Sequence, residues 1–195
     1  MSKSDSSTAK KERNKAIRWV VTIFFVTIFV SGTISFISDA IMEASTMALA
    51  FLILLGIVLI GILFDVIGVA VTSANEKPFH SMAARKVPGA QESIRLLRNA
   101  ERVSSICNDV VGDICGVVSG SASATIAAQL LQQATISTPQ IVGLSMSALV
   151  AGLTVGGKAI GKTVAIKSCT GIVHSVGKVI WLLHHIPQLL KKKDR

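Results

Sequence analysis

The sequence predicts an all-α integral membrane protein with about four transmembrane helices and short amphipathic helices in a cytoplasmic loop and tail. Of the 195 residues 50% are hydrophobic, the mean hydropathy is +0.61, and 16% are charged, against about 25% in a soluble domain. Apolar runs recur along the chain, and basic residues gather between them. A large soluble core is the alternative, and the lengths of the apolar runs disfavour it.

The N-terminal part combines a polar start with an apolar run. Residues 1–15 are polar and Lys-rich, which predicts a disordered basic arm. Residues 16–38 are almost wholly apolar and predict an extra transmembrane helix. A cleavable signal peptide is the alternative, but the run is long and no clear A-x-A site follows it. A short acidic link with Asp39 and Glu43 comes next.

A transmembrane domain is expected over residues 47–163, with spans at about 47–72, 105–131 and 141–160. The span at 47–72 has 26 residues and one charge, Asp65, where about 20 apolar residues suffice to cross a bilayer. The other two spans are rich in Gly, Ala and Ser. Small residues of this kind let membrane helices approach each other closely.

Amphipathic segments flank the last two spans. Residues 75–100 predict two short surface helices, with a break at Pro88 and Gly89. Residues 164–195 mix apolar and basic side chains in a helical stripe and predict an amphipathic basic tail, with Trp181 at the membrane interface.

The distribution of basic residues predicts the orientation. The Lys and Arg residues fall in groups of 6 before residue 19, 6 between residues 73 and 104, and 8 from residue 158 onward. Four spans place all three groups on one side of the membrane. By the positive-inside rule that side is the cytoplasm, so we expect a multi-pass protein of the cell membrane with both termini cytoplasmic.

Three aspartates lie inside the predicted spans: Asp65, Asp109 and Asp113. A charge in hydrocarbon costs a few kcal/mol, so such a residue is by default a functional candidate. Helical spacing puts each aspartate on a stripe with glycines, which predicts that both stripes face the bundle. The stripes are Gly61, Asp65, Gly68 and Thr72, and Asp109, Gly112, Asp113, Gly116 and Gly120.

These carboxylates share the predicted cytoplasmic half with Lys158. Three carboxylates and one ammonium carry a net charge of −2, which a hard divalent cation with oxygen ligands could balance. Asn108 offers a further oxygen. The alternative is a structural polar cluster in which Lys158 neutralises one aspartate.

Other functional classes fit the sequence poorly. Residues 156–163 read GGKAIGKT and fit the phosphate loop G-x-x-x-x-G-K-[ST], but that loop needs a surrounding sheet, and 32 residues follow it. We therefore expect no nucleotide and no enzyme. Aromatic residues make up 5% of the chain and lie mostly in apolar runs, which argues against nucleic acid. The three cysteines form no C-x-x-C, and the spacing of the histidines makes no metal set.

The same glycine-rich segment has a second resemblance. From Gly157 onward it resembles the G-E-x-x-P-K-[ST] element that ends the last span in the transmembrane domain, of the domain-of-unknown-function-21 type, of the CorB/CorC and cyclin M (CNNM) magnesium transporter family. Gly157, Lys162 and Thr163 match, whereas Lys158 replaces the Glu and Gly161 the Pro.

Two upstream segments carry the same resemblance. FDVIGVAVTS is similar to the family's F-S-x-x-E-T-A-L-x-S, with Asp65 in place of Ser and Gly68 in place of Glu. AQESIRLLRNAERVSSICND resembles A-x-x-x-L-x-x-N-P-x-R followed by G-N-x-x-x-N. There Arg102 and Asn108 match, while Asp109, Gly112 and Asp113 sit at the family's Asn and its neighbours.

The resemblance covers about residues 48–183 and implies a three-span domain with a belt of short helices after its first span, usually dimeric. The span at 16–38 would be an addition, and the paired CBS regulatory domains are expected to be absent. It implies divalent cation (Mg2+) transport or its regulation; the alternative is a non-transporting membrane scaffold or partner subunit. The implied metal residues are Asp65, Asn108, Asp109, Asp113 and Gly157, with Lys158 as the charge-compensating residue.

Overall fold

The computed structural model describes residues 3–43, 45–133 and 139–193, and these ranges contain helices and no strand. Four helical segments are long and apolar enough to cross a membrane, and each overlaps one predicted span. The expected class, an all-α membrane protein, is therefore confirmed. The four segments are Ile17–Met42, Met47–Ser73, Ala100–Gln132 and Gln140–Lys167.

The first helix, α1 (Lys3–Glu43), is longer than the sequence indicates. The basic arm expected to be disordered is helical from Lys3, and the expected link with Asp39 and Glu43 forms the last turns of the same helix. Lys, Ala, Glu and Arg in the arm favour a helix, and an apolar helix that already exists extends at little cost. Residues 1 and 2 lie outside the described ranges.

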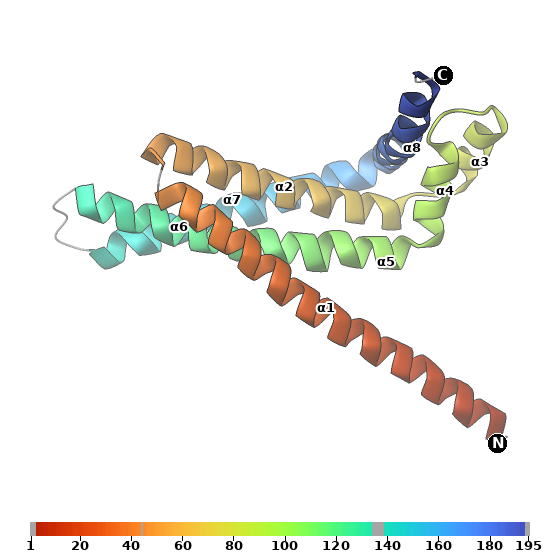
Figure 1. The fold of residues 1–195 in the computed structure, drawn as a ribbon, viewed down its shortest axis with the longest axis horizontal. Helices are drawn as coiled ribbons and strands as arrows, with labels where there is room; N and C mark the ends of the chain where they lie inside the picture. Colours follow the sequence, from red (N-terminus) through yellow and green to blue (C-terminus); the bar gives the residue numbers. More distant parts are fainter. Residues whose placement is uncertain (1–2, 44, 134–138, 194–195) are drawn as a thin grey trace.

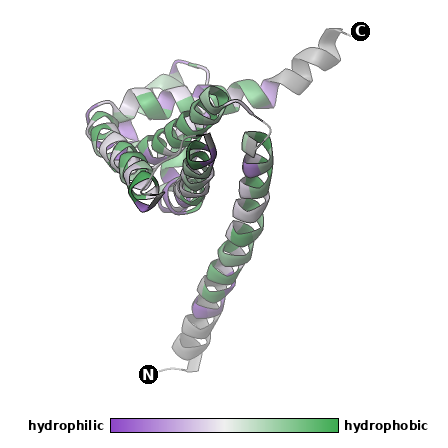
Figure 2. Ribbon diagram, turned by 90° about the vertical axis from the view of Figure 1, so that its left-hand side faces the viewer, coloured by the Kyte–Doolittle hydropathy of each residue, from purple (hydrophilic) through white to green (hydrophobic). Residues whose placement is uncertain are grey.

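Helix α1 packs against α6 (Asp113–Gln133) near its C-terminal end and diverges from the bundle toward its N-terminus (Figures 1 and 2). None of the most apolar window of α1 is buried, against 22% for α2 (Met47–Ser73). Large side chains such as Phe29 and Phe36 are about three-quarters exposed, so α1 suits a lipid environment. The core that anchors its end consists of Met42, Ala50, Leu54, Val58, Ala122 and Ile126.

The central bundle consists of α2, α6 and α7 (Pro139–Lys167). Glycines on α7 set its approach to α2. A Cβ added to Gly157 would overlap the side chain of Ile62, and one added to Gly161 would lie 2.6 Å from Val66 Cγ2. Without these side chains the helices come close enough for α7 to present its neighbouring residues directly to α2.

Helix α6 is preceded by α5 (Ala100–Ser105) and by a π-helical segment, η1 (Ile106–Gly112). The three form one span, five residues longer at its start than the expected 105–131. A π-helical turn takes more residues than an α-helical turn, so it rotates the side chains that follow relative to an ideal α-helix. Single π-turns of this kind occur frequently at functional sites.

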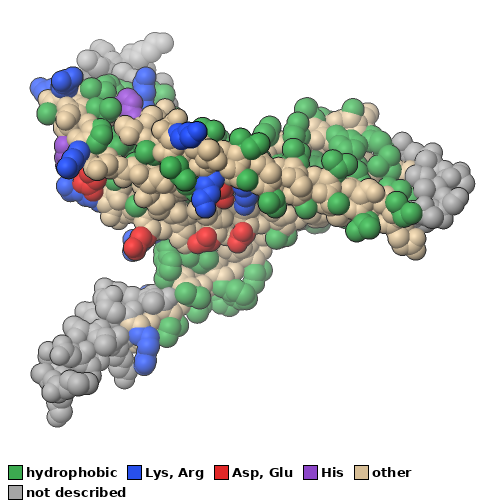
Figure 3. Space-filling model, turned by 180° about the vertical axis from the view of Figure 1, so that it is seen from behind, with side chains coloured by type: hydrophobic (Ala, Val, Ile, Leu, Met, Phe, Trp, Pro, Cys, Tyr) green, Lys and Arg blue, Asp and Glu red, His purple; other side chains and the backbone are tan. Residues whose placement is uncertain are grey.

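Short helices gather at one end of the bundle, called the basic end below. They are α3 (Lys77–Ala84), α4 (Ala90–Arg98) and α5, and the longer α8 (Cys169–Lys193) lies with them. Figure 3 shows charged side chains mostly over the half of the molecule with this end, and hydrophobic side chains over the other half. Two short helices were expected within residues 75–100, and α3 and α4 occupy these positions.

The segment expected as an amphipathic tail packs against other helices of the chain. Helix α7 continues to Lys167, and α8 then packs across α4. Gly177 lies against the backbone of Gly89, and the hydroxyl of Ser93 donates to the carbonyl of Val173 at 3.2 Å. Gly89 has φ +85°, where glycine is favoured. The core at this end consists of Ala70, Val71, Phe79, Leu97, Ala165 and Val173.

Candidate functional site

The centre of the candidate site is an ion pair between two membrane-spanning helices. The Nζ atom of Lys158 on α7 lies 3.7 Å from Oδ1 of Asp65 on α2. Their side chains are 28% and 17% exposed, and both residues fall inside candidate spans. Because an isolated charge costs a few kcal/mol within a bilayer, each residue reduces the cost of burying the other.

Two glycines lie next to this pair. Gly112, the last residue of η1, is buried, and a Cβ added to it would lie 3.5 Å from Lys158 Nζ. Gly157 precedes Lys158 and brings α7 onto Ile62, one turn before Asp65. The ammonium group therefore lies where α2, η1 and α7 meet.

Asn108 lies on the other side of Asp65. Its amide packs so closely on α2 that a Cβ added to Gly68 would overlap Asn108 Oδ1. Its Nδ2 donates to Ser104 Oγ at 3.2 Å, whereas its Oδ1 is buried and has no hydrogen-bond donor among the described residues. A buried acceptor without a donor is uncommon and costs free energy, so it marks a place where a ligand could compensate.

The other two aspartates lie elsewhere. Asp109 and Asp113 are exposed, and the hydroxyl of Ser105 donates to Asp109 Oδ2 at 2.9 Å. Within the described ranges, no three His, Cys, Asp or Glu side chains are grouped as metal ligands. Of the expected ligand set, the structure thus brings Asn108 and Gly157 against α2, one turn after and one turn before Asp65.

The structure corrects the prediction that the glycine stripe on α6 faces the bundle. Gly112 is buried as expected, but Gly116 and Gly120 are exposed, and a Cβ added to either would meet nothing within 4 Å. Asp109 and Asp113 are exposed, and Gly116 and Gly120 line an open groove between α6 and α7, so the stripe is not packed against another helix of the chain. Asp113, Gly116 and Gly120 follow the π-helical segment and keep α-helical spacing, so the error lies in which face was expected to be packed, since small residues alone do not identify it.

No match to this chain is found among protein-family models, curated proteins or solved structures. The resemblance to the CorB/CorC and cyclin M family therefore rests on the three quoted segments and stays a prediction.

A second polar contact lies at the end of the bundle opposite the basic end, and sequence reasoning missed it. Asp39 on α1 accepts a hydrogen bond from Ser121 Oγ at 2.9 Å and one from Thr125 Oγ1 at 3.3 Å. Close by, the side-chain amide of Gln129 donates to the carbonyl of Met42 at 2.9 Å. The i, i+4 pair of hydroxyls at Ser121 and Thr125 was the available signal.

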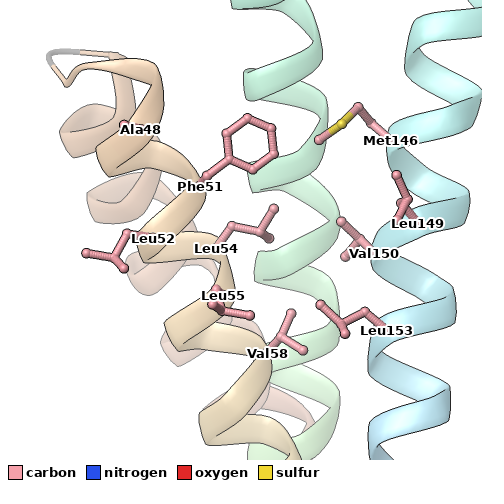
Figure 4. A pocket seen from close by; sticks show the side chains of 10 residues that line it. All are labelled: Ala48, Phe51, Leu52, Leu54, Leu55, Val58, Met146, Leu149, Val150 and Leu153. Atoms are coloured by element: carbon pink, nitrogen blue, oxygen red, sulfur yellow. The ribbon is translucent and has the colours of Figure 1, made fainter.

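An apolar groove of about 450 Å³ separates α2 and α7 beyond this site. Its ten lining side chains come from these two helices and are all apolar (Figure 4). Such a lining offers no ligand to an ion, so we exclude the groove from the candidate site. The lining residues are Ala48, Phe51, Leu52, Leu54, Leu55, Val58, Met146, Leu149, Val150 and Leu153.

Proposed function

We propose that this membrane protein handles a divalent cation, as a Mg2+ transporter or a regulator of Mg2+ transport, at the junction of α2, η1 and α7. One observation carries the proposal: Gly157 and Asn108 contact α2 one turn before and one turn after Asp65. The family resemblance assigns an ion to the same three positions, and it does so from sequence motifs without reference to this geometry. Two independent arguments therefore favour one place.

Each residue has a distinct part in this proposal. Asp65 supplies the negative charge, and the unpartnered Oδ1 of Asn108 supplies a neutral oxygen, both of which suit a hard cation. Gly157 allows α7 to approach. Lys158 acts as a tethered cation that neutralises Asp65, so an incoming ion competes with its ammonium group.

A specific observation favours a second function, that of a non-transporting membrane scaffold or partner subunit. The Asp65–Lys158 pair is already neutral, and the exposed Asp109 and Asp113 add no charge to it. In this alternative the pair serves only to hold α2 against α7.

The proposal includes an orientation and an assembly. The three basic groups support a cell-membrane protein with both termini in the cytoplasm, and the family resemblance supports a homodimer. Neither an enzymatic activity nor a nucleotide or nucleic-acid ligand belongs to the proposed function.

The test is thermal stabilisation of the purified full chain by Mg2+, since a ligand that binds only the folded state stabilises it. We expect Mg2+ to raise the Tm of the wild type and to raise that of Lys158→Glu at lower concentration, because the competing ammonium is gone. Asp65→Asn should abolish both effects. Lys167→Glu is the matched control, since it makes the same charge change at an exposed position near the end of α7.

The outcome also separates the two functions. A purely structural pair predicts that Lys158→Glu expresses poorly, because it leaves two carboxylates without a cation, and that Mg2+ does not rescue it. Equal stabilisation of the wild type and of Asp65→Asn by Mg2+ would disprove the proposed site.

A further inference from the structure

A recess of about 340 Å³ lies between α1 and α5 at the basic end. It is lined by Arg18, Trp19 and Thr22 of α1 and by Arg102 of α5. The guanidinium carbon of Arg102 lies 5.4 Å from the centroid of the Trp19 ring. This cation–π contact joins two helices that otherwise diverge, and it holds Arg102 at the edge of the recess.

The recess carries positive charge without an acidic partner. Two of its four lining residues are arginines, and none is Asp or Glu. The ion pairs found among the described residues involve neither Arg18 nor Arg102. Two guanidinium groups at one recess repel each other, and a bound anion relieves that repulsion. The planar donor fork of arginine matches the oxygens of a phosphate.

The position of the recess relative to the membrane favours a lipid over a free anion. Arg18 and Arg102 each lie in the first turn of a candidate span, Ile17–Met42 and Ala100–Gln132. Both therefore stand at the same membrane boundary, where tryptophan is also favoured. Lipid phosphates occupy this boundary.

The surface that continues from the recess into the membrane is apolar. Val26 and Phe29, which follow Thr22 by one and two turns on the same face of α1, are 47% and 75% exposed. Toward its N-terminus α1 leaves the bundle (Figure 1), so these side chains remain available to acyl chains. A phosphate at the recess with chains along α1 fits both surfaces, whereas a free anion uses only the first.

We propose that the recess binds the phosphate group of an anionic phospholipid in the leaflet at the basic end. Arg18 and Arg102 hold the phosphate oxygens, Thr22 donates a further hydrogen bond, and Trp19 keeps Arg102 in place. Basic pockets between membrane helices bind anionic headgroups in this way. The lipid then links the diverging half of α1 to the bundle, which α1 otherwise contacts mainly at its other end.

The experiment uses the full chain purified in detergent with equal amounts of phosphatidylglycerol and phosphatidylcholine, and mass spectrometry counts the lipids that remain bound. We expect the wild type to retain phosphatidylglycerol preferentially. Arg18→Gln and Arg102→Gln should each reduce that preference about fivefold, the effect of one basic residue near an anionic surface. Arg95→Gln, an exposed position on α4 outside the recess, is the matched control and should change nothing.

The Tm of each protein distinguishes the alternatives. Phosphatidylglycerol should raise the Tm of the wild type, and inorganic phosphate at the same concentration should not. A rise with inorganic phosphate equal to that with the lipid would overturn the lipid assignment in favour of a free-anion site. If Arg95→Gln lost the preference for phosphatidylglycerol equally, the lipid would be attracted by basic side chains in general, and the proposal would be disproved. The absence of any lipid preference in the wild type would also disprove it. Arg18→Gln serves as the folded variant if Arg102→Gln loses the Trp19 contact and unfolds.

Discussion

Lys158 and Asp65 form a 3.7 Å ion pair that joins α7 to α2 inside the membrane-spanning part of the chain. Both residues contribute to the interior of one site, since Gly157, next to Lys158, lacks the side chain that would otherwise overlap Ile62 and hold α7 away from α2. The pair explains how two adjacent spans each tolerate a charged residue. It also makes the two residues interdependent, which can be measured.

The first prediction concerns this interdependence. Asp65→Ala and Lys158→Ala should each lower the free energy of unfolding by about 2 kcal/mol, between the values for exposed and fully buried pairs, because the side chains are partly exposed. The double variant should lose less than the sum of the two single variants, since it leaves no unpaired charge. A double-mutant cycle of unfolding free energies in detergent measures this coupling. Strictly additive effects would show that the two residues act separately.

The second prediction compares two adjacent glycines on α7. Gly157→Ala should destabilise the protein by about 1–3 kcal/mol, because its methyl group would overlap Ile62 in a packed contact. Gly156→Ala should instead stabilise by about 0.5–1 kcal/mol, since nothing lies within 4 Å of its added Cβ and alanine favours a helix more than glycine. Thermal unfolding of the two variants gives the comparison, and Ile62→Ala should restore part of the loss in Gly157→Ala. Equal effects at positions 156 and 157 would contradict the observed rotation of α7.

The third prediction links packing to cation handling at Asn108. Gly68→Ala would place a methyl group on the Asn108 amide, which must then move. We expect a loss of stability of about 1–3 kcal/mol and, under the proposed function, a weaker stabilisation by Mg2+. The control Gly56→Ala has open space around its Cβ and should show neither effect. A Gly68→Ala variant that keeps the full Mg2+ response would remove Asn108 from the proposed site.

The sequence predicts the spans well because hydropathy and length are local properties. All four expected spans have counterparts, and Asp65 and Gly68 were correctly placed on a face toward the bundle. The face of Asp109, Asp113 and Gly116 was not, since glycine spacing defines a stripe but does not show whether that stripe is packed against another helix. This error concerns only the face of the third span that carries these residues.

Contacts between distant segments were the other limit of the sequence. Asp39 meets Ser121 and Thr125 across 82 and 86 positions of the chain. Nothing in the local pattern around Asp39 indicates which helix faces it, because the membrane-spanning part of α1 carries apolar side chains on all sides. Similarly, the amphipathic pattern of α8 does not indicate which helix it packs on, and in the structure Gly177 and Val173 close a core with α4.

The fourth prediction tests the attachment of α1. Asp39→Leu removes the acceptor for both hydroxyl groups and should lower stability by about 1 kcal/mol, the usual size of such contacts in membranes. Because the contact holds α1 on α6, cross-linking between cysteines introduced on these two helices should also decrease. Asp39→Asn keeps an acceptor oxygen and should show a smaller effect. Full cross-linking in Asp39→Leu would show that apolar packing at Met42 suffices.

The fifth prediction concerns orientation, since the same three basic groups that define one end of the structure predict the cytoplasmic side. Single cysteines are placed at Ser45, Ser137 and Ser81 in a background without Cys107, Cys115 and Cys169.

An impermeant thiol reagent applied to whole cells should label the cysteines at Ser45 and Ser137 and should leave the one at Ser81 unlabelled until the membrane is opened. Ser81 is exposed on α3, so burial within the protein does not protect it. Ser45 lies between α1 and α2 at the opposite end. Ser137 lies outside the described residues, and its expected position follows from the sequence alone. Four spans place both links on one side of the membrane and the loop with Ser81 on the other. Labelling of Ser81 from outside would therefore show that the orientation is reversed or that the number of spans is different. Either result would also move Arg18 and Arg102 away from the cytoplasmic leaflet.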